Sequence, residues 1–149
     1  MKNRYSKSGI QMLDLAKEYK YMKTDIDKAI KGVLKHQQWV LGPEVKELEE
    51  EVSRYLKVKH CIGVASGTDA LLLSLRALAI KIKGKEFFDR DDEIITTPFT
   101  FVATAEAILR SGATPVFVDI EEDTFNIDPK MIKESITKNT VGIVLVHLF

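Results

Sequence analysis

The sequence predicts an α/β fold, in which helices connect the parallel strands of one sheet. From residue 60 onward, short apolar runs alternate with amphipathic segments in the order strand, helix, strand, helix, strand, helix, strand. The last run, VGIVLV at 141–146, is apolar throughout, which is typical of a central parallel strand buried on both faces. The 149 residues are 45% hydrophobic, a composition that suits one folded domain.

Two helices are expected before residue 60. Residues 20–36 bring their apolar side chains to one face at three- and four-residue steps. A second helix is expected to begin at Pro43, because a proline in the first turn loses no helical hydrogen bond. The apolar side chains expected to form its buried stripe are Val45, Leu48, Val52, Tyr55 and Leu56.

Four strands and three helices are expected after this point. The strands are HCIGVA at 60–65, EIITT at 93–97, PVFVDI at 115–120 and the run at 141–146. The helix at 69–82 is expected to turn inward Leu71, Leu72, Leu75, Leu78, Ala79 and Ile82. The next helix is expected to be capped by Thr100 and to end at Ser111, with Gly112 in a left-handed conformation. A short last helix is expected from Asp128 and Pro129.

Charge and cysteine content exclude several classes of protein. The 22 basic and 22 acidic side chains give zero net charge, whereas general nucleic-acid and membrane-surface binders need an excess of Lys and Arg. Cys61 is the only cysteine, so no internal disulfide is expected, and no Cys/His cluster has the spacing of metal ligands. The sequence has neither a signal-peptide pattern nor the roughly 18 apolar residues of a membrane span. A reducing cytoplasm is the expected setting.

The most informative local feature is the tripeptide Ser66, Gly67 and Thr68 between a strand and a helix. A helix N-terminus presents unpaired backbone N–H groups and a partial positive charge, and glycine lets a ligand approach the backbone. The tripeptide is therefore a candidate phosphate cradle. Helix capping alone is the other interpretation, since Ser and Thr are common caps.

A second candidate is TPFTFVAT at 97–104, where the next strand meets its helix. Alpha/beta sheets usually bind ligands at this edge, and Phe99 or Phe101 could cover a flat aromatic ligand. The alternative is that both rings pack in the core. Asp119 and His147 are weaker candidates at the same edge. The sequence contains no GxGxxG, Walker, GxSxG or HExxH motif, so it gives no support to the functions that these motifs indicate.

Taken together, the segments resemble the DegT/DnrJ/EryC1/StrS family of sugar aminotransferases, which depend on pyridoxal 5′-phosphate (PLP). Five strings occur in the family's order, over about residues 10–149. They are WVLGPEV at 39–45, SGTDAL at 66–71, TPFTFVAT at 97–104, GATPVFVDI at 112–120 and VHLF at 146–149. Five ordered strings are far more specific than any one of them.

The resemblance implies a function for each string. Gly67 and Thr68 would hold the cofactor phosphate, flanked by Ser66 and Asp69, and Phe101 would stack on the pyridine ring. The loop from Trp39 to Gly42 would lie near an active site built at a homodimer interface, and His147 is a weaker candidate for substrate or interface contact. The implied reaction moves an amino group from an amino acid, typically glutamate, to a nucleotide-linked keto-sugar of a polysaccharide or deoxysugar pathway.

The resemblance also implies that the chain is incomplete. The family's Schiff-base lysine and the aspartate that pairs with the pyridine nitrogen lie downstream of the segment ending at Phe149, and no lysine here matches that motif. We therefore expect residues 1–149 to form a single partial domain, the incomplete large domain of fold type I PLP-dependent transferases. Residues 1–59 would be its N-terminal helical segment and 60–149 its strand–helix alternation. This chain alone is expected to lack transaminase activity, to leave its first strand unpaired and to be prone to aggregation.

Three other interpretations remain open from the sequence. One is part of a PLP- or pyridoxamine-phosphate-dependent sugar dehydratase, in which histidine replaces the lysine. Another is a non-catalytic remnant or interaction module. The third is an unrelated flavodoxin-like domain, which predicts a complete parallel sheet with a paired first strand.

Overall fold

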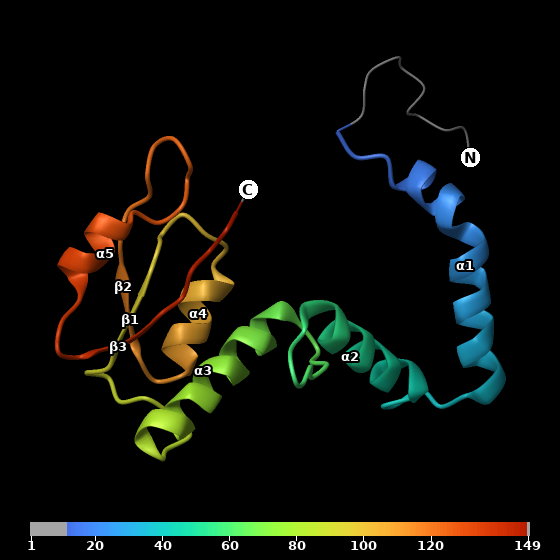
Figure 1. Cartoon of the computed structure of the whole chain (residues 1–149), viewed down its shortest axis with the longest axis horizontal. Coiled ribbons are helices and arrows are strands. Elements are labelled where there is room, and N and C mark those ends of the chain that lie inside the picture. Colours follow the sequence, from blue (N-terminus) through green and yellow to red (C-terminus); the bar gives the residue numbers. More distant parts are fainter. Residues whose placement is uncertain (1–11, 149) are drawn as a thin grey trace. The chain divides into compact units, whose positions relative to one another are not determined.

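The computed structural model describes residues 12–148, which form helices and a small parallel sheet. The chain divides into two compact units, residues 1–63 and residues 64–149. The organisation of the whole chain as a single partial domain remains a prediction. Figure 1 shows two helices in the first unit and the sheet with its helices in the second.

The first unit contains helices α1 (Leu15–His36) and α2 (Pro43–Leu56). The predicted start at Pro43 is confirmed, and α1 ends at His36 as expected but begins before residue 20. Asp14 caps α1, because its carboxylate accepts the N–H of Lys17 at 3.0 Å. His36 Nε2 lies 2.7 Å from Glu44 Oε1, which links the end of α1 to the first turn of α2.

The expected buried stripe of α2 is wrong. Leu48, Tyr55 and Leu56 are exposed, and Val45 and Val52 are only half-buried. The periodicity of α2 makes one face apolar, but no described helix or strand of this unit covers that face.

The second unit is the α/β structure that the sequence predicts. Its elements are α3 (Gly67–Lys83), β1 (Glu93–Thr96), α4 (Ala103–Arg110), β2 (Thr114–Phe117), α5 (Pro129–Ser135) and β3 (Thr140–Ile143). The strands form a parallel sheet in the order β2-β1-β3 (Figure 1). Asp128 caps α5 by accepting the N–H of Lys130, so the predicted start of that helix is confirmed.

Two strand assignments need correction. Residues 60–65 are not a strand, because no described segment pairs with them, and the N–H of Gly63 instead donates to Glu49 Oε1 at 2.7 Å. This agrees with the expectation that the first strand is left unpaired, and it contradicts the flavodoxin-like interpretation. Among the described strands, the central one is β1, and β3 lies at an edge despite its apolar sequence.

The core of the second unit lies on both faces of the sheet. Ile94 and Ile95 are fully buried and point to opposite faces, as neighbours in a strand must. The Ile94 face is covered by α3 and α4, and the Ile95 face by Val118, Ile127 and the half-buried Ile132 of α5. On α3 the buried side chains are Leu72, Leu75 and Ala79, with Leu71 and Leu78 half-buried. The expected burial of Ile82 is wrong, since this side chain in the last turn is 48% exposed.

The predicted cap at the start of α4 is wrong, whereas the predicted left-handed glycine after its end is confirmed. Thr100 does not cap α4, which begins at Ala103 after a helical Val102; the Thr100 hydroxyl instead lies 2.9 Å from that of Thr104. Gly112 has a positive φ of 96°, as expected. A Cβ at Gly112 would lie 2.3 Å from the carbonyl oxygen of Phe88, so the chain passes too closely for any side chain.

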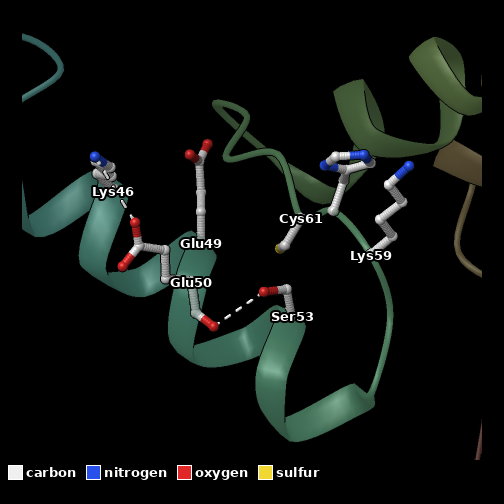
Figure 2. Close-up of a pocket in the computed structure, with 7 residues that line it drawn as sticks. Lys46, Glu49, Glu50, Ser53, Lys59 and Cys61 are labelled. Atoms are coloured by element: carbon white, nitrogen blue, oxygen red, sulfur yellow. Dashed lines mark hydrogen bonds and ion pairs between the residues drawn. The ribbon is translucent and has the colours of Figure 1, made fainter.

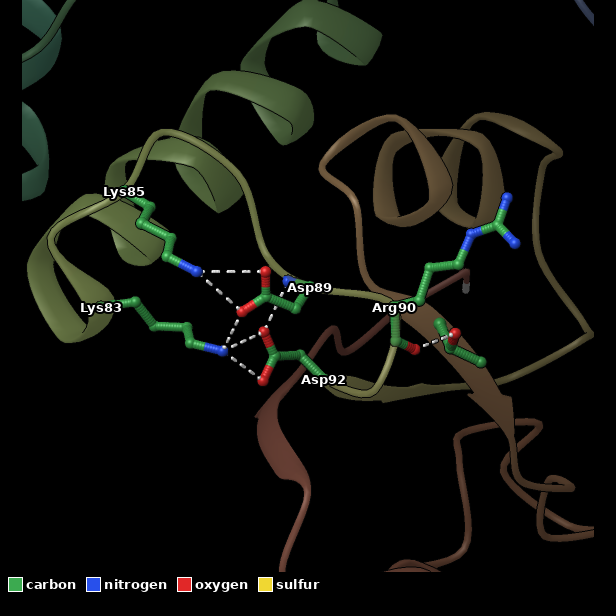
Figure 3. A network of polar contacts seen from close by, with 6 residues as sticks. Lys83, Lys85, Asp89, Arg90 and Asp92 are labelled. Atoms are coloured by element: carbon green, nitrogen blue, oxygen red, sulfur yellow. Dashed lines mark hydrogen bonds and ion pairs between the residues drawn. The ribbon is translucent and has the colours of Figure 1, made fainter.

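An ion-pair network joins the end of α3 to the start of β1 (Figure 3). Lys83 Nζ donates to Asp92 at 2.8 and 2.6 Å and to Asp89 at 2.9 Å, while Lys85 contacts Asp89 at 3.2 Å. Asp92 is buried and also accepts the backbone N–H of Asp89 at 2.7 Å. The network therefore fixes the connection that feeds the central strand.

Replacing Asp92 by alanine is expected to destabilise the protein by about 1–3 kcal/mol, because it removes three hydrogen bonds and leaves a backbone N–H without its acceptor. Urea unfolding followed by circular dichroism measures the effect. Asp91→Ala is the matched control, since Asp91 is the exposed neighbour and should change stability by less than about 0.5 kcal/mol. Equal effects of the two substitutions would contradict a structural role for the network.

The same network predicts a dependence of stability on pH. Hydrogen bonds from Lys83 and then Lys85 lower the pKa of Asp89, so its contribution is complete above its unfolded pKa and is lost as the pH falls through the lower folded pKa. The hydrogen bonds that Lys83 donates to Asp92 and then to Asp89 raise the pKa of Lys83, so its contribution is complete below its unfolded pKa and is lost as the pH rises through the raised folded pKa. We expect Asp89→Asn to destabilise the protein at neutral pH and to have a smaller effect near pH 3. A difference of the same size at both pH values would contradict this linkage.

Candidate functional site

The first turn of α3 has the geometry of an N-terminal cap. Ser66 Oγ accepts the N–H of Asp69 at 3.1 Å and donates to the Asp69 carboxylate at 2.9 Å. The Ser66 carbonyl accepts the N–H of Ala70 at 3.0 Å, the first bond of the helix. Ser66 is therefore the N-cap of α3, and Asp69 completes the cap.

The cap leaves two backbone donors at the start of α3. Within the described part of the chain, the N–H groups of Gly67 and Thr68 have no acceptor. A Cβ at Gly67 would meet no atom within 4 Å, so the space beside this residue is open. Two free N–H groups, the Thr68 hydroxyl and the positive end of a 17-residue helix are a donor set that fits a phosphate dianion.

Phe101 lies in the connection from β1 to α4 and is 72% exposed, while Phe99 is 41% exposed. The interpretation that both rings pack in the core is therefore wrong. The connection is held from within by threonines. Buried Thr97 accepts the N–H of Phe99 through its hydroxyl at 3.1 Å, and the N–H of Thr104 donates to the Phe101 carbonyl at 3.1 Å.

The topology places these two features toward one edge of the sheet. Residues 84–92 lead from the end of α3 to the start of β1, and residues 97–102 lead from the end of β1 to the start of α4. Both helices therefore run opposite to β1, and they pack side by side on one face (Figure 1). The start of α3 and the Phe101 connection thus both lie toward the carboxyl edge of the sheet, where ligands bind in parallel α/β folds.

The weaker candidates are not brought into this arrangement by any described hydrogen bond. His147 is exposed, and its Nδ1 lies 3.3 Å from Asn126 Oδ1. Asp119 accepts the N–H of Ile120 at 2.8 Å. In the first unit, Trp39 is 62% exposed, and Gly42 is buried at the N-cap of α2, where a Cβ would lie 2.4 Å from the Gln38 carbonyl oxygen.

The first unit also contains an open cavity of about 190 Å³, which the sequence did not indicate (Figure 2). Its lining residues are Lys46, Glu49, Glu50, Ser53, Lys59, His60 and Cys61. Much of the lining is already paired, since Lys46 lies 3.8 Å from Glu50 and Glu49 accepts the N–H of Gly63. In residues 12–148, no group of three or more His, Cys, Asp or Glu side chains could hold a metal ion. None of the described helices has the length and apolarity needed to cross a membrane.

A contact that the sequence did not indicate lies beside Phe101. The rings of Phe99 and Phe125 are 6.0 Å apart between centroids and are tilted by 33°. The two residues come from different connections, one after β1 and one before α5. No local pattern could reveal such a pair, because the sheet brings the two connections together.

The chain matches a known protein family over most of its length. The model of the DegT/DnrJ/EryC1/StrS aminotransferase family matches residues 20–149. The UDP-2-acetamido-2-deoxy-3-oxo-D-glucuronate aminotransferase of Pseudomonas aeruginosa is 41% identical over 140 residues, which are 94% of this chain and 37% of that protein. The chain therefore spans little more than a third of the length of such relatives.

Two solved structures resemble this chain over most of its length. The crystal structure of DesV from S. venezuelae matches 96% of this chain and 36% of its own, with a TM-score of 0.85 and 35% identity. A GDP-4-keto-6-deoxymannose-3-dehydratase with bound GDP-perosamine matches 79% of this chain and 30% of its own, with a TM-score of 0.71 and 32% identity. Both aminotransferases and dehydratases thus share this arrangement of helices and strands.

Proposed function

Because the chain belongs to the DegT/DnrJ/EryC1/StrS aminotransferase family, we propose that it supplies the phosphate- and ring-binding part of a PLP-dependent aminotransferase for nucleotide-linked keto-sugars. The observation that supports this most directly is the pair of free N–H groups at Gly67 and Thr68, on the same edge of the sheet as exposed Phe101. The similarity to the UDP-2-acetamido-2-deoxy-3-oxo-D-glucuronate aminotransferase of P. aeruginosa supports the class of substrate.

Each residue has a distinct part in this proposal. Gly67 and Thr68 donate backbone N–H groups to the cofactor phosphate, and the dipole of α3 stabilises its charge. Ser66 and Asp69 hold the first turn in the conformation that directs these donors outward. Phe101 covers one face of the pyridine ring. When bound, PLP supplies the electron sink for transfer of an amino group from glutamate to the keto-sugar.

The lysine and aspartate that the family uses for chemistry match no residue of this chain, so turnover requires groups that these residues do not supply. The lack of transaminase activity in the 149-residue chain remains a prediction. Formation of 2-oxoglutarate from glutamate by the purified chain, with PLP and a nucleotide-linked keto-sugar, would contradict it.

Binding of a cofactor analogue tests the proposed site without chemistry. 4′-Deoxypyridoxine 5′-phosphate lacks the aldehyde, so it cannot form a Schiff base with any lysine. We expect calorimetry to show that the chain binds this probe at least about tenfold more tightly than it binds 4′-deoxypyridoxine, since charge-assisted hydrogen bonds to the phosphate are lost in the latter. Equal affinity for the two compounds would show that the start of α3 is not a phosphate site.

The proposal extends to assembly and location. The family resemblance implies that the Trp39–Gly42 loop lies near an active site built at a homodimer interface, and the exposed Trp39, Val40 and Leu41 of that loop give it an apolar surface suited to a partner. The zero net charge favours small-molecule substrates over nucleic acid or a membrane surface. A cytoplasmic location is proposed because the single cysteine, Cys61, cannot form an internal disulfide, as is usual for proteins of a reducing compartment.

A sugar dehydratase is the second candidate, and the match to the GDP-4-keto-6-deoxymannose-3-dehydratase supports it. The two candidates use the same phosphate and ring contacts in this chain. A histidine in the position of the Schiff-base lysine would favour the dehydratase. A non-catalytic role would be favoured if the chain folds and binds a partner but not the probe.

A further inference from the structure

We infer that Phe125 is a positioning residue for the cofactor ring: through the ring of Phe99, it holds the connection that carries Phe101. The inference rests on the proposed role of Phe101. It assigns a function to the 121–126 connection, which contains none of the predicted site residues.

Local hydrogen bonds hold the start of the connection that carries Phe101. The buried Thr97 hydroxyl accepts the N–H of Phe99, and the N–H of Thr100 donates to the Pro98 carbonyl at 3.0 Å. These bonds fix the backbone close to the end of β1. The Phe99 side chain keeps 41% of its surface exposed.

Phe125 contacts that side chain from a separate connection. The centroid distance of 6.0 Å and the tilt of 33° lie in the range of favourable aromatic pairs. Phe99 is two residues before Phe101, so the position of its ring constrains the backbone that leads to Phe101. Phe101 itself keeps most of its surface free for a ligand.

Backbone hydrogen bonds hold the 121–126 connection together. Ile120 and Ile127 form an antiparallel bridge at its base, and the N–H of Glu121 donates to the Asn126 carbonyl at 2.9 Å. The N–H of Phe125 donates to the Glu121 carbonyl at 3.0 Å. Phe125 has a φ of 57°, a left-handed conformation that is uncommon for a residue with a large side chain. The connection therefore keeps a strained residue in place, and the ring of that residue contacts Phe99.

The test compares Phe125→Asn with Phe125→Tyr. Asparagine removes the ring but tolerates the left-handed conformation, so the backbone of the connection is preserved, whereas tyrosine keeps the ring. We expect Phe125→Asn to weaken binding of 4′-deoxypyridoxine 5′-phosphate about three- to tenfold and to reduce the circular dichroism induced in the bound probe. Phe125→Tyr should keep both the affinity and the induced circular dichroism of the unaltered chain. Phe87→Asn is the matched control, because Phe87 is a half-exposed ring in the connection at the amino end of β1 and should leave both readouts unchanged.

A double substitution separates an effect through Phe99 from a direct contact with the probe. If Phe125 acts through Phe99, Phe125→Asn should cause no further loss in a Phe99→Leu background. A full additional loss in that background, or unchanged binding by Phe125→Asn alone, would overturn the inference while leaving the proposed function intact. Failure of the unaltered chain to bind the probe would overturn both.

Discussion

Replacing Gly112 by alanine is expected to destabilise the second unit by about 3–5 kcal/mol. At a φ of 96°, an alanine is strained whatever surrounds it. The new Cβ would also lie 2.3 Å from the carbonyl oxygen of Phe88. Phe88 cannot withdraw easily, because its side chain is buried in the core and its N–H donates to the Ser111 carbonyl at 2.9 Å. Because small domains have a stability of about 5–15 kcal/mol, the loss should appear as a much lower urea midpoint or the absence of a cooperative transition.

Gly84→Ala is the matched control for this effect. Gly84 follows α3 with a φ of 68°, but a Cβ there would meet no atom within 4 Å. Its replacement should therefore cost only the backbone strain, about 1 kcal/mol. Similar losses in the two variants would mean that the close passage of Gly112 past Phe88 adds nothing to the cost.

Replacing Thr68 by glutamate is expected to weaken binding of 4′-deoxypyridoxine 5′-phosphate by at least about tenfold, because a carboxylate within about 4 Å of a phosphate repels it by roughly 1–4 kcal/mol per charge pair. The same change should leave the protein as stable as before or about 0.3–1 kcal/mol more stable, since an acidic residue in the first turn interacts favourably with the helix dipole. Calorimetric titration and urea unfolding of the same sample measure the two effects.

Ser74→Glu adds the same charge to the exposed middle of α3 and should leave binding unchanged. Thr68→Glu is expected to lower the affinity for the probe without lowering the stability of the protein. A variant that merely unfolds would lose both affinity and stability, so the two cases can be distinguished. If Ser74→Glu and Thr68→Glu weakened binding equally, the phosphate would have to bind somewhere other than the start of α3.

Local signals in the sequence predicted the starts of α2 and α5, whereas α1 begins before residue 20 and Thr100 does not cap α4. Pro43 begins α2, and Asp128 and Ser66 cap α5 and α3, because each of these residues satisfies or avoids a backbone requirement within its own turn. The three strands that pair were also predicted in order. The parallel topology followed from the alternation of elements, which needs no knowledge of distant contacts.

Three of the failures share one physical cause, the presence or absence of a neighbouring segment. The sequence pattern of α2 and of residues 60–65 shows that each segment has an apolar surface. It does not show whether another segment covers or pairs with that surface, and no described segment does so. The edge position of β3 depends likewise on which strands are present beside it. At the candidate site, Ser66 and Gly67 could be recognised from their own turn, whereas the contact of Phe99 with Phe125 exists only after the sheet has formed.

The strand order has a consequence for how the second unit folds. Only α4 separates β1 from β2, so this pairing closes a short loop, and α4 packs on both strands it connects. The pairing of β1 with β3 must span α4, β2 and α5 and therefore has a larger loop-closure entropy to overcome. The segment from β1 to β2 is thus the expected folding nucleus, to which β3 is added later. Phe101 belongs to this early segment, whereas Phe125 reaches its place only as the later contacts form.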